Sequence, residues 1–104
     1  MEGGVASNIA RAMRFVDGLD FDGFLSDEKT FYAATRCLEI ISEASRRLSS
    51  ALKERYPSIP WRAVAASGSF YRHNYEDVLE RRIWQTIHEA LPLLREVVDA
   101  ELRN

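Results

Sequence analysis

A single stripe of apolar residues at helical spacing runs through the middle of the chain and defines its longest predicted element. Apolar side chains that recur every three or four residues share one face of an α-helix. The members of the stripe are Ala34, Leu38, Ile41, Leu48 and Leu52, with Ala33, Cys37, Ile40 and Ala44 beside them. Continued without interruption, this pattern predicts a helix about 42 Å long, the backbone of a helical bundle.

Residue types at either end of the stripe set the limits of this helix. Ser26, with Asp27 and Glu28 behind it, predicts the start. A hydroxyl caps free backbone N–H groups, and acidic residues suit the positive end of the helix dipole. Arg55 is the predicted last residue, because the sequence Tyr-Pro-Ser-Ile-Pro follows it and proline interrupts a helix.

Three further helices are predicted on similar grounds. The first begins near Ser7 and ends at Gly18, and residues 19–27 then form a packed loop. The third starts at Pro60, a residue that suits the first turn of a helix. The fourth follows the acidic run after residue 75 and contains Pro92, which should kink or divide it at the preceding residue.

The sequence contains no alternating apolar pattern typical of a strand, no internal repeat and no linker. Its 104 residues are 46% hydrophobic, a composition that favours a folded domain with a real core. We therefore expect one domain over residues 1–104, an all-α, up-and-down four-helix bundle with a kinked last helix.

Charge and cysteine content limit the classes of partner. The 14 basic and 16 acidic residues give a net charge of −2, so any contact with nucleic acid must be local. The single Cys37 cannot form an internal disulfide, which fits a reducing cytoplasm. No apolar run approaches membrane-spanning length, and we expect a cytoplasmic protein without a membrane partner.

The motifs of metal and nucleotide sites are missing from the sequence. His73 and His88 are 15 residues apart, no His-Glu-x-x-His run occurs, and one cysteine cannot build a thiolate site. No glycine-rich phosphate loop is present either. We therefore expect no cofactor and no metal.

Residues 70–75, Phe-Tyr-Arg-His-Asn-Tyr, are the strongest candidate for chemistry. They belong to a stretch without any acidic residue from Pro57 to Tyr75. Arg72 is a permanent cation, His73 titrates near neutrality, and the tyrosines can stack on bases or donate a hydroxyl. A site for a phosphate ester or an RNA backbone would use such groups. The alternative is that Arg72 and His73 only cap the C-terminal end of a helix.

Glu43 is a second candidate, because it is an acid beside the apolar stripe. It is flanked by Ile40 and Ala44, where a residue needed only for solubility is less expected. A supporting role in a site is one interpretation. A structural ion pair with Arg36, Arg46 or Arg47 is the other.

Two motifs make the chain resemble the HepT-like family of the wider HEPN group. The run Leu-Glu-Ile-Ile-Ser-Glu-Ala at residues 38–44 is similar to the family's Leu-Glu-Ile-Ile-Gly-Glu-Ala signature. The run from Pro60 through Trp61 and Arg62 to His73 and Tyr75 is similar to a second signature, with Asn74 in place of the usual Asp. The resemblance covers nearly the whole chain.

This resemblance implies a helical homodimer that acts as the ribonuclease toxin of a toxin–antitoxin pair. It implies that His73, with an arginine and residues of both protomers, forms the site that cleaves RNA. It also implies that a nucleotidyltransferase antitoxin transfers AMP to Tyr75 and so silences the toxin.

The chain departs from the family pattern at one position that bears on activity. Gly68 and Ser69 stand where the pattern has Arg-Asn, and the nearest arginine is Arg72, adjacent to His73. We assign Arg72 and His73 as catalytic and Ser69 with Glu43 as supporting. Two other functions stay open: a non-catalytic partner and AMP acceptor of a nucleotidyltransferase, which Gly68 favours, and a bundle without a site, which the retained His-x-Tyr disfavours.

Overall fold

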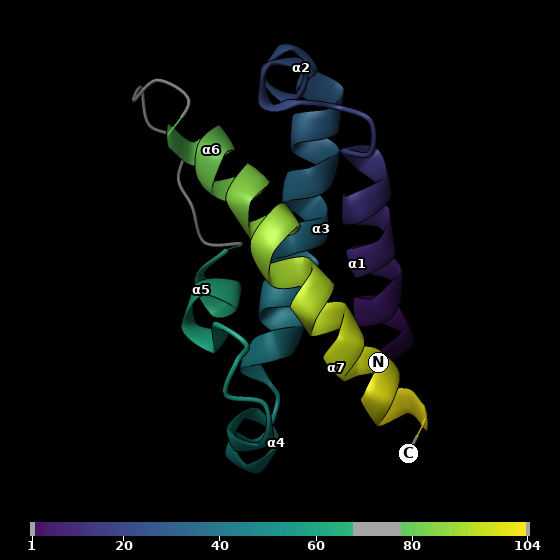
Figure 1. Cartoon of the computed structure of the whole chain (residues 1–104), viewed down its shortest axis with the longest axis vertical. Coiled ribbons are helices and arrows are strands. Elements are labelled where there is room, and N and C mark those ends of the chain that lie inside the picture. The colour runs from purple at the N-terminus through teal and green to yellow at the C-terminus, as the bar shows by residue number, and fades with distance from the viewer. Residues whose placement is uncertain (1, 68–77, 104) are drawn as a thin grey trace.

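The central element of the computed structural model is α3 (Glu28–Arg46), and the structure describes residues 2–67 and 78–103 (Figure 1). This helix begins one residue later than predicted, because Asp27 and not Ser26 is its cap. The Asp27 carboxylate accepts from the Thr30 backbone N–H at 3.2 Å and from the Thr30 hydroxyl at 2.8 Å. These hydrogen bonds lower the pKa of the Asp27 carboxyl, and the bond from the Thr30 hydroxyl contributes most. The cap therefore stabilises the fold at pH values above the ordinary pKa of an aspartic acid. This stabilisation is lost as the pH falls through the lowered pKa of Asp27.

The predicted continuation of the central helix to Arg55 is wrong. The helix stops at Arg46, and a separate short helix, α4 (Ser50–Arg55), follows. Ser49 causes the restart, because it is extended and its hydroxyl accepts from the Leu52 N–H at 3.1 Å, as an N-cap does. The far end of the apolar stripe consequently leaves the core, and Leu48 is 36% exposed.

The first helix, α1 (Glu2–Phe15), begins before the predicted Ser7. The extra turn lets Val5 pack against the core. The helix ends at Phe15, three residues before the predicted Gly18. Gly18 lies in the turn that follows and has a φ of +81°, a conformation that glycine adopts without strain.

Residues 19–27 were expected to form a loop and instead contain the short helix α2 (Phe21–Ser26). The Asp20 carboxylate caps it by accepting from the Gly23 N–H at 2.8 Å. Six residues are too few to show helical periodicity, yet they bury Phe24 completely.

The second half of the chain contains one short helix and one long interrupted one. The short helix is α5 (Trp61–Ala66), with Pro60 at its cap position. The long one consists of α6 (Val78–Gln85), the π turn η1 (Thr86–Ala90) and α7 (Leu91–Arg103). At the end of η1 the Leu91 N–H donates to the Thr86 carbonyl, five residues back. Pro92 explains this division, because proline lacks an N–H and its ring collides with the carbonyl four residues back.

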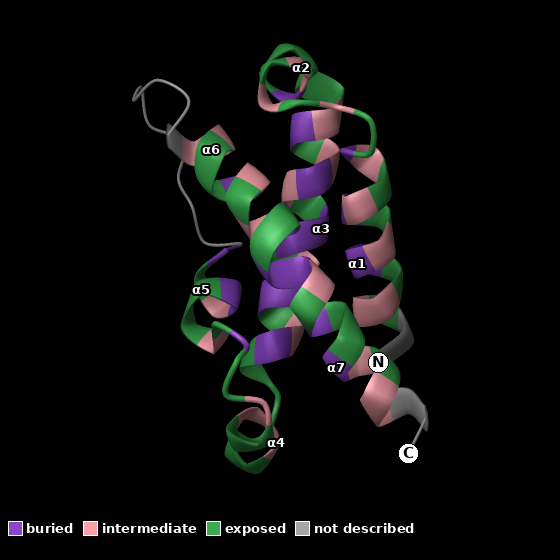
Figure 2. Cartoon of the chain, in the orientation of Figure 1, coloured by how far each residue is buried: buried purple, intermediate pink, exposed green. Residues whose placement is uncertain are grey.

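The helices pack around α3, with α1 on one side, α5 on the other, and the interrupted helix crossing over them (Figure 1). Buried residues occur along each of these helices (Figure 2), and together they form the core. The all-α class is confirmed, and the described residues contain no strand. The four long helices predicted are divided more finely than expected. The core contains Ile9, Ala12, Val16, Phe24, Phe31, Ala34, Cys37, Leu38, Ile41, Ile59, Val64, Ile83, Ile87, Ala90, Leu91, Leu94 and Val97.

We expect Phe24→Ala to lower the free energy of unfolding by about 3–5 kcal/mol, as for other fully buried phenylalanines. Phe24 is 0% exposed and its ring lies 5.2 Å from that of Trp84. Leu25 is the matched control, because it is the next residue but 37% exposed. Leu25→Ala should cost about 0.5 kcal/mol or less. Equal losses for the two variants in urea denaturation would contradict this assignment of the core.

Candidate active site

The candidates Ser69, Arg72, His73 and Tyr75 follow α5 in the sequence and lie outside the described residues. The structure places the two helices that flank them, since α5 ends at Ala66 and α6 begins with residue 78. Both helices pack on α3, and Figure 1 shows them on the same side of it. The chain therefore leaves and rejoins the described fold beside α3.

Buried contacts fix the end of α5. Val64 is 0% exposed and Ser67 is 1% exposed. The Val64 carbonyl accepts from the Ser67 N–H at 3.2 Å and from the Ser67 hydroxyl at 2.7 Å. Ser67 thereby satisfies one of the carbonyls that a helix leaves without a partner in its last turn.

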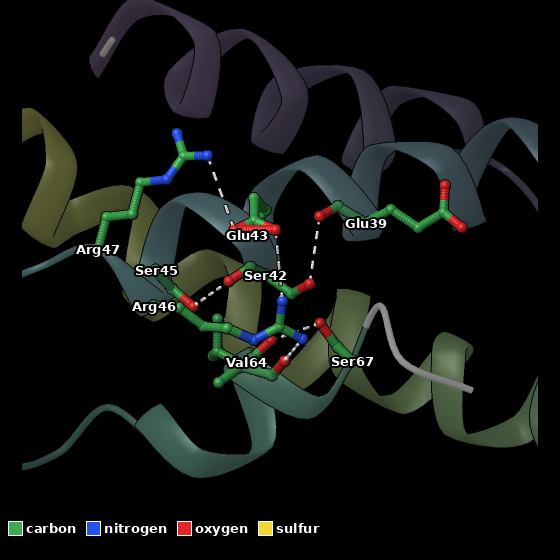
Figure 3. A network of polar contacts seen from close by, with 9 residues as sticks. Glu39, Ser42, Glu43, Ser45, Arg46, Arg47, Val64 and Ser67 are labelled. Atoms are coloured by element: carbon green, nitrogen blue, oxygen red, sulfur yellow. Dashed lines mark hydrogen bonds and ion pairs between the residues drawn. The ribbon is translucent and has the colours of Figure 1, made fainter.

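Arg46 crosses from α3 to the same end of α5 (Figure 3). One guanidinium nitrogen, Nη2, donates to the Ala65 carbonyl at 2.8 Å. A cation is favoured there, because the C-terminal end of a helix carries partial negative charge. The Arg46 side chain is 43% exposed, so it lies at the surface while it joins two elements.

Glu43 lies on α3 beside Arg46 and Arg47 and pairs with both. Its carboxylate oxygens are 3.6 Å from Arg46 Nη1 and 3.7 Å from Arg47 Nη2. The Glu43 side chain is 55% exposed, and exposed pairs of this kind contribute little to stability. The structural ion pair weighed for Glu43 is therefore present, with Arg46 and Arg47 as its partners. Arg36 pairs with Glu39 instead.

Small buried hydroxyls lie where α3 faces α5 (Figure 3). Ser42 and Ser45 are 1% and 4% exposed. Their hydroxyls donate to carbonyls of their own helix, Ser42 to Glu39 at 3.1 Å and Ser45 to Ser42 at 2.8 Å. Ser42 stands where the family signature has glycine, and its buried hydroxyl has a hydrogen-bond partner. Small side chains here let the two helices approach closely.

The second histidine of the chain serves its own helix. His88 is exposed and its ring stacks on Trp84, with 4.1 Å between ring centroids. Its Nδ1 lies 2.9 Å from the Trp84 carbonyl oxygen. A carbonyl only accepts, so Nδ1 carries the hydrogen.

Residues 2–67 and 78–103 hold no group of three or more His, Cys, Asp or Glu side chains placed to bind a metal ion. Within the same ranges no helix is long and apolar enough to cross a membrane. Cys37 lies in the core as predicted, and burial raises the pKa of its thiol. A buried thiol of this kind is an inert core side chain.

The comparison with known families decides the class of protein. A family described as Ribonuclease HepT-like matches residues 5–101. This chain belongs to that HepT-like family. The match includes the connection between α5 and α6 with all four candidates from Ser69 to Tyr75.

Individual relatives agree with this family. A protein of Thermococcus cleftensis named "Probable ribonuclease HepT" is 37% identical, over 88% of this chain and 83% of its own. A relative from Caldanaerobacter subterraneus subsp. tengcongensis, named as a candidate RNase, is 35% identical over 86% of this chain and 80% of its own. Another candidate RNase, from Methanocaldococcus jannaschii, is 31% identical over 85% of this chain and 73% of its own. No solved structure matches the chain significantly.

The HepT-like family is a ribonuclease family, so its substrate class is RNA.

The contact of Arg46 with Ala65 was not predicted from the sequence. Spacing indicated an ion-pair partner for Glu43, but the Ala65 carbonyl is 19 residues beyond Arg46 in the sequence. The acid-free stretch from residue 57 to 75 was the sequence signal in that region.

Proposed function

We propose that this HepT-like protein is the toxin of a toxin–antitoxin pair and cleaves RNA without a metal ion in the cytoplasm. One observation carries the proposal: the ribonuclease family matches residues 5–101, including the motif with His73 and Tyr75. Two helices packed on α3 flank the motif, and an arginine of α3 holds the end of one of them.

The proposed reaction is attack of a ribose 2′-oxygen on the adjacent phosphorus. His73 of one protomer takes the proton of the 2′-hydroxyl as general base. The new bond from this oxygen to phosphorus forms as the bond to the 5′-oxygen breaks. His73 of the other protomer gives a proton to the departing 5′-oxygen. The products are a 2′,3′-cyclic phosphate and a free 5′-hydroxyl.

The ribose 2′-hydroxyl provides the test of this function. An RNA with one preferred cleavage site should be cut in EDTA, and the same RNA with a single 2′-deoxy residue at that site should resist. Cleavage of both substrates at the same bond would refute attack by the 2′-oxygen. Cleavage of neither would refute the ribonuclease proposal for this chain.

Arg72→Ala should slow cleavage by about 10²–10³-fold, or about 2.7–4 kcal/mol of transition-state stabilisation. The reason is that a guanidinium next to His73 stabilises the negative charge that grows on the phosphate oxygens. Arg62→Ala is the matched control, because Arg62 is exposed and eleven residues before His73. An unchanged rate in Arg72→Ala, with single-turnover kinetics on saturating RNA, would assign the cation elsewhere.

We propose a homodimer whose contact includes the outer side of α5. Ala63 and Ala66 are exposed and three residues apart on that helix. Both line a cavity of about 470 Å³ between α5 and the interrupted helix, together with Leu93, which is 38% exposed. Small residues of this kind let a second helix approach closely.

Light scattering at micromolar concentration should therefore give the mass of a dimer. Ala66→Arg should shift the mass toward the monomer, because a long charged side chain fills the place of a methyl group. Leu25→Arg is the control, because Leu25 lies on α2 and is also exposed. A monomeric wild type, or equal effects of the two variants, would contradict a dimer at this surface.

Regulation of the toxin is assigned to Tyr75. We infer that a nucleotidyltransferase antitoxin adds AMP to its phenol oxygen, two residues after His73. A bulky anion there would pair with Arg72 and exclude RNA. In the same arrangement Ser69 and Glu43 have supporting roles.

The second candidate function is a non-catalytic partner and AMP acceptor of a nucleotidyltransferase. Gly68 favours it, because the family pattern that the chain resembles has an arginine there. Both functions need Tyr75, and they differ in whether RNA is cleaved. The substrate comparison above therefore separates them.

A further inference from the structure

Arg46 is a described side chain that links the surface of α3 to the end of α5. Its Nη2 donates to the Ala65 carbonyl at 2.8 Å, a length typical of charge-assisted hydrogen bonds. Ala65 is the last residue but one of α5, and residue 68 follows three positions later. The contact is therefore made where the chain approaches the candidate residues.

The end of α5 needs such a contact because the helix is short. It has six residues, and isolated helices of this length are not stable in water. Its last carbonyls lack partners within the helix. Ser67 supplies one for Val64 and Arg46 supplies one for Ala65.

Glu43 lies beside Arg46 on the same helix while Arg46 makes this contact. Its carboxylate lies 3.6 Å from Arg46 Nη1, while the other guanidinium nitrogen, Nη2, reaches Ala65. The three groups form a chain from α3 to α5 (Figure 3). An arginine fits this role better than a lysine, because its planar fork offers separate nitrogens to the two partners.

We propose that Arg46 is a positioning residue for RNA cleavage, acting by fixing the end of α5 before Gly68. This inference rests on the proposed ribonuclease function. Catalysis is sensitive to small displacements, and a shift of about 1 Å in a reacting group can cost about 100-fold in rate. Arg46 acts on the protein backbone and not on RNA, so its loss lowers kcat and leaves KM unchanged.

The same helix offers matched control arginines. Arg36 pairs with Glu39 three residues on, at 3.3 Å, as Arg46 pairs with Glu43 three residues back. Arg47 shares Glu43 with Arg46. Among the contacts of the described residues, Arg46 reaches α5, whereas Arg36 pairs within α3 and Arg47, the residue that follows α3, pairs with Glu43 of α3.

The test combines amide hydrogen exchange with cleavage kinetics on the full chain. Arg46→Gln should speed exchange in the peptide that contains Val64 to Ser67 and lower kcat by about 10- to 100-fold. Arg46→Lys, which keeps the cation, should recover part of both losses. Arg36→Gln and Arg47→Gln should leave exchange and kcat as in the wild type.

Each other outcome overturns the proposal in a distinct way. Unchanged exchange in Arg46→Gln would refute the anchor. Faster exchange with unchanged kcat would refute its role in positioning. A raised KM with unchanged kcat would instead make Arg46 an RNA contact. An inactive wild type refutes the ribonuclease function and the positioning role together, and exchange then still decides whether the anchor exists.

Discussion

Tyr75→Phe is expected to take up no AMP from the cognate nucleotidyltransferase, whereas the wild type takes up one AMP per chain. In the proposed transfer the phenol oxygen is the nucleophile. It attacks the α-phosphorus of ATP, the bond to pyrophosphate breaks and the phenol loses its proton. Phenylalanine has the same ring but no oxygen, so transfer should stop. Intact-mass and peptide spectrometry on the pair with ATP and Mg²⁺ measures this.

The same substitution should leave the toxin active in the presence of its antitoxin. The reason is that AMP at position 75 should add negative charge near Arg72 and His73 and occupy the place of an RNA phosphate. Tyr32→Phe is the matched control, since Tyr32 is 55% exposed on α3. It should be modified and silenced like the wild type. AMP on another residue, or none with an active antitoxin, would refute the assignment of Tyr75.

His73→Ala is expected to abolish RNA cleavage while the helical content stays unchanged. A positioned general acid or base contributes about 10²–10⁴-fold, and in the proposed dimer one substitution removes both. Circular dichroism and a cleavage assay measure the two properties.

His88→Ala is the control that separates catalysis from the general loss of a histidine. His88 is exposed and stacked on Trp84, and its Nδ1 hydrogen bonds within its own helix. Its loss should leave cleavage unchanged. Activity that persists in His73→Ala, or that disappears in both variants, would move the catalytic group elsewhere.

The long apolar periodicity predicted the core correctly, but it did not predict where the central helix ends, because local capping residues start and stop helices within the pattern. The stripe through Leu38 and Ile41 is fully buried as its spacing indicated. Its continuation to Leu52 fails because Ser49 caps a new helix, although the apolar positions continue past it. The α2 helix was missed because six residues cannot show a period of 3.6.

The candidate site was predicted in two different ways. The pairing of Glu43 with Arg46 and Arg47 followed from their spacing of three and four residues on one helix. The contact of Arg46 with Ala65 depends on how α5 packs on α3, which local spacing does not encode. The roles of His73 and Tyr75 came from a family resemblance, and Arg72 was assigned because it is the nearest arginine to His73. All three roles remain predictions.

The measurement that tests the central claim most directly is the identity of the RNA ends produced by the purified wild type in EDTA. We expect fragments with a 2′,3′-cyclic phosphate and a 5′-hydroxyl, formed by an activity that co-elutes with the protein. Intact RNA, or fragments that carry 3′-hydroxyl and 5′-phosphate ends, would contradict it.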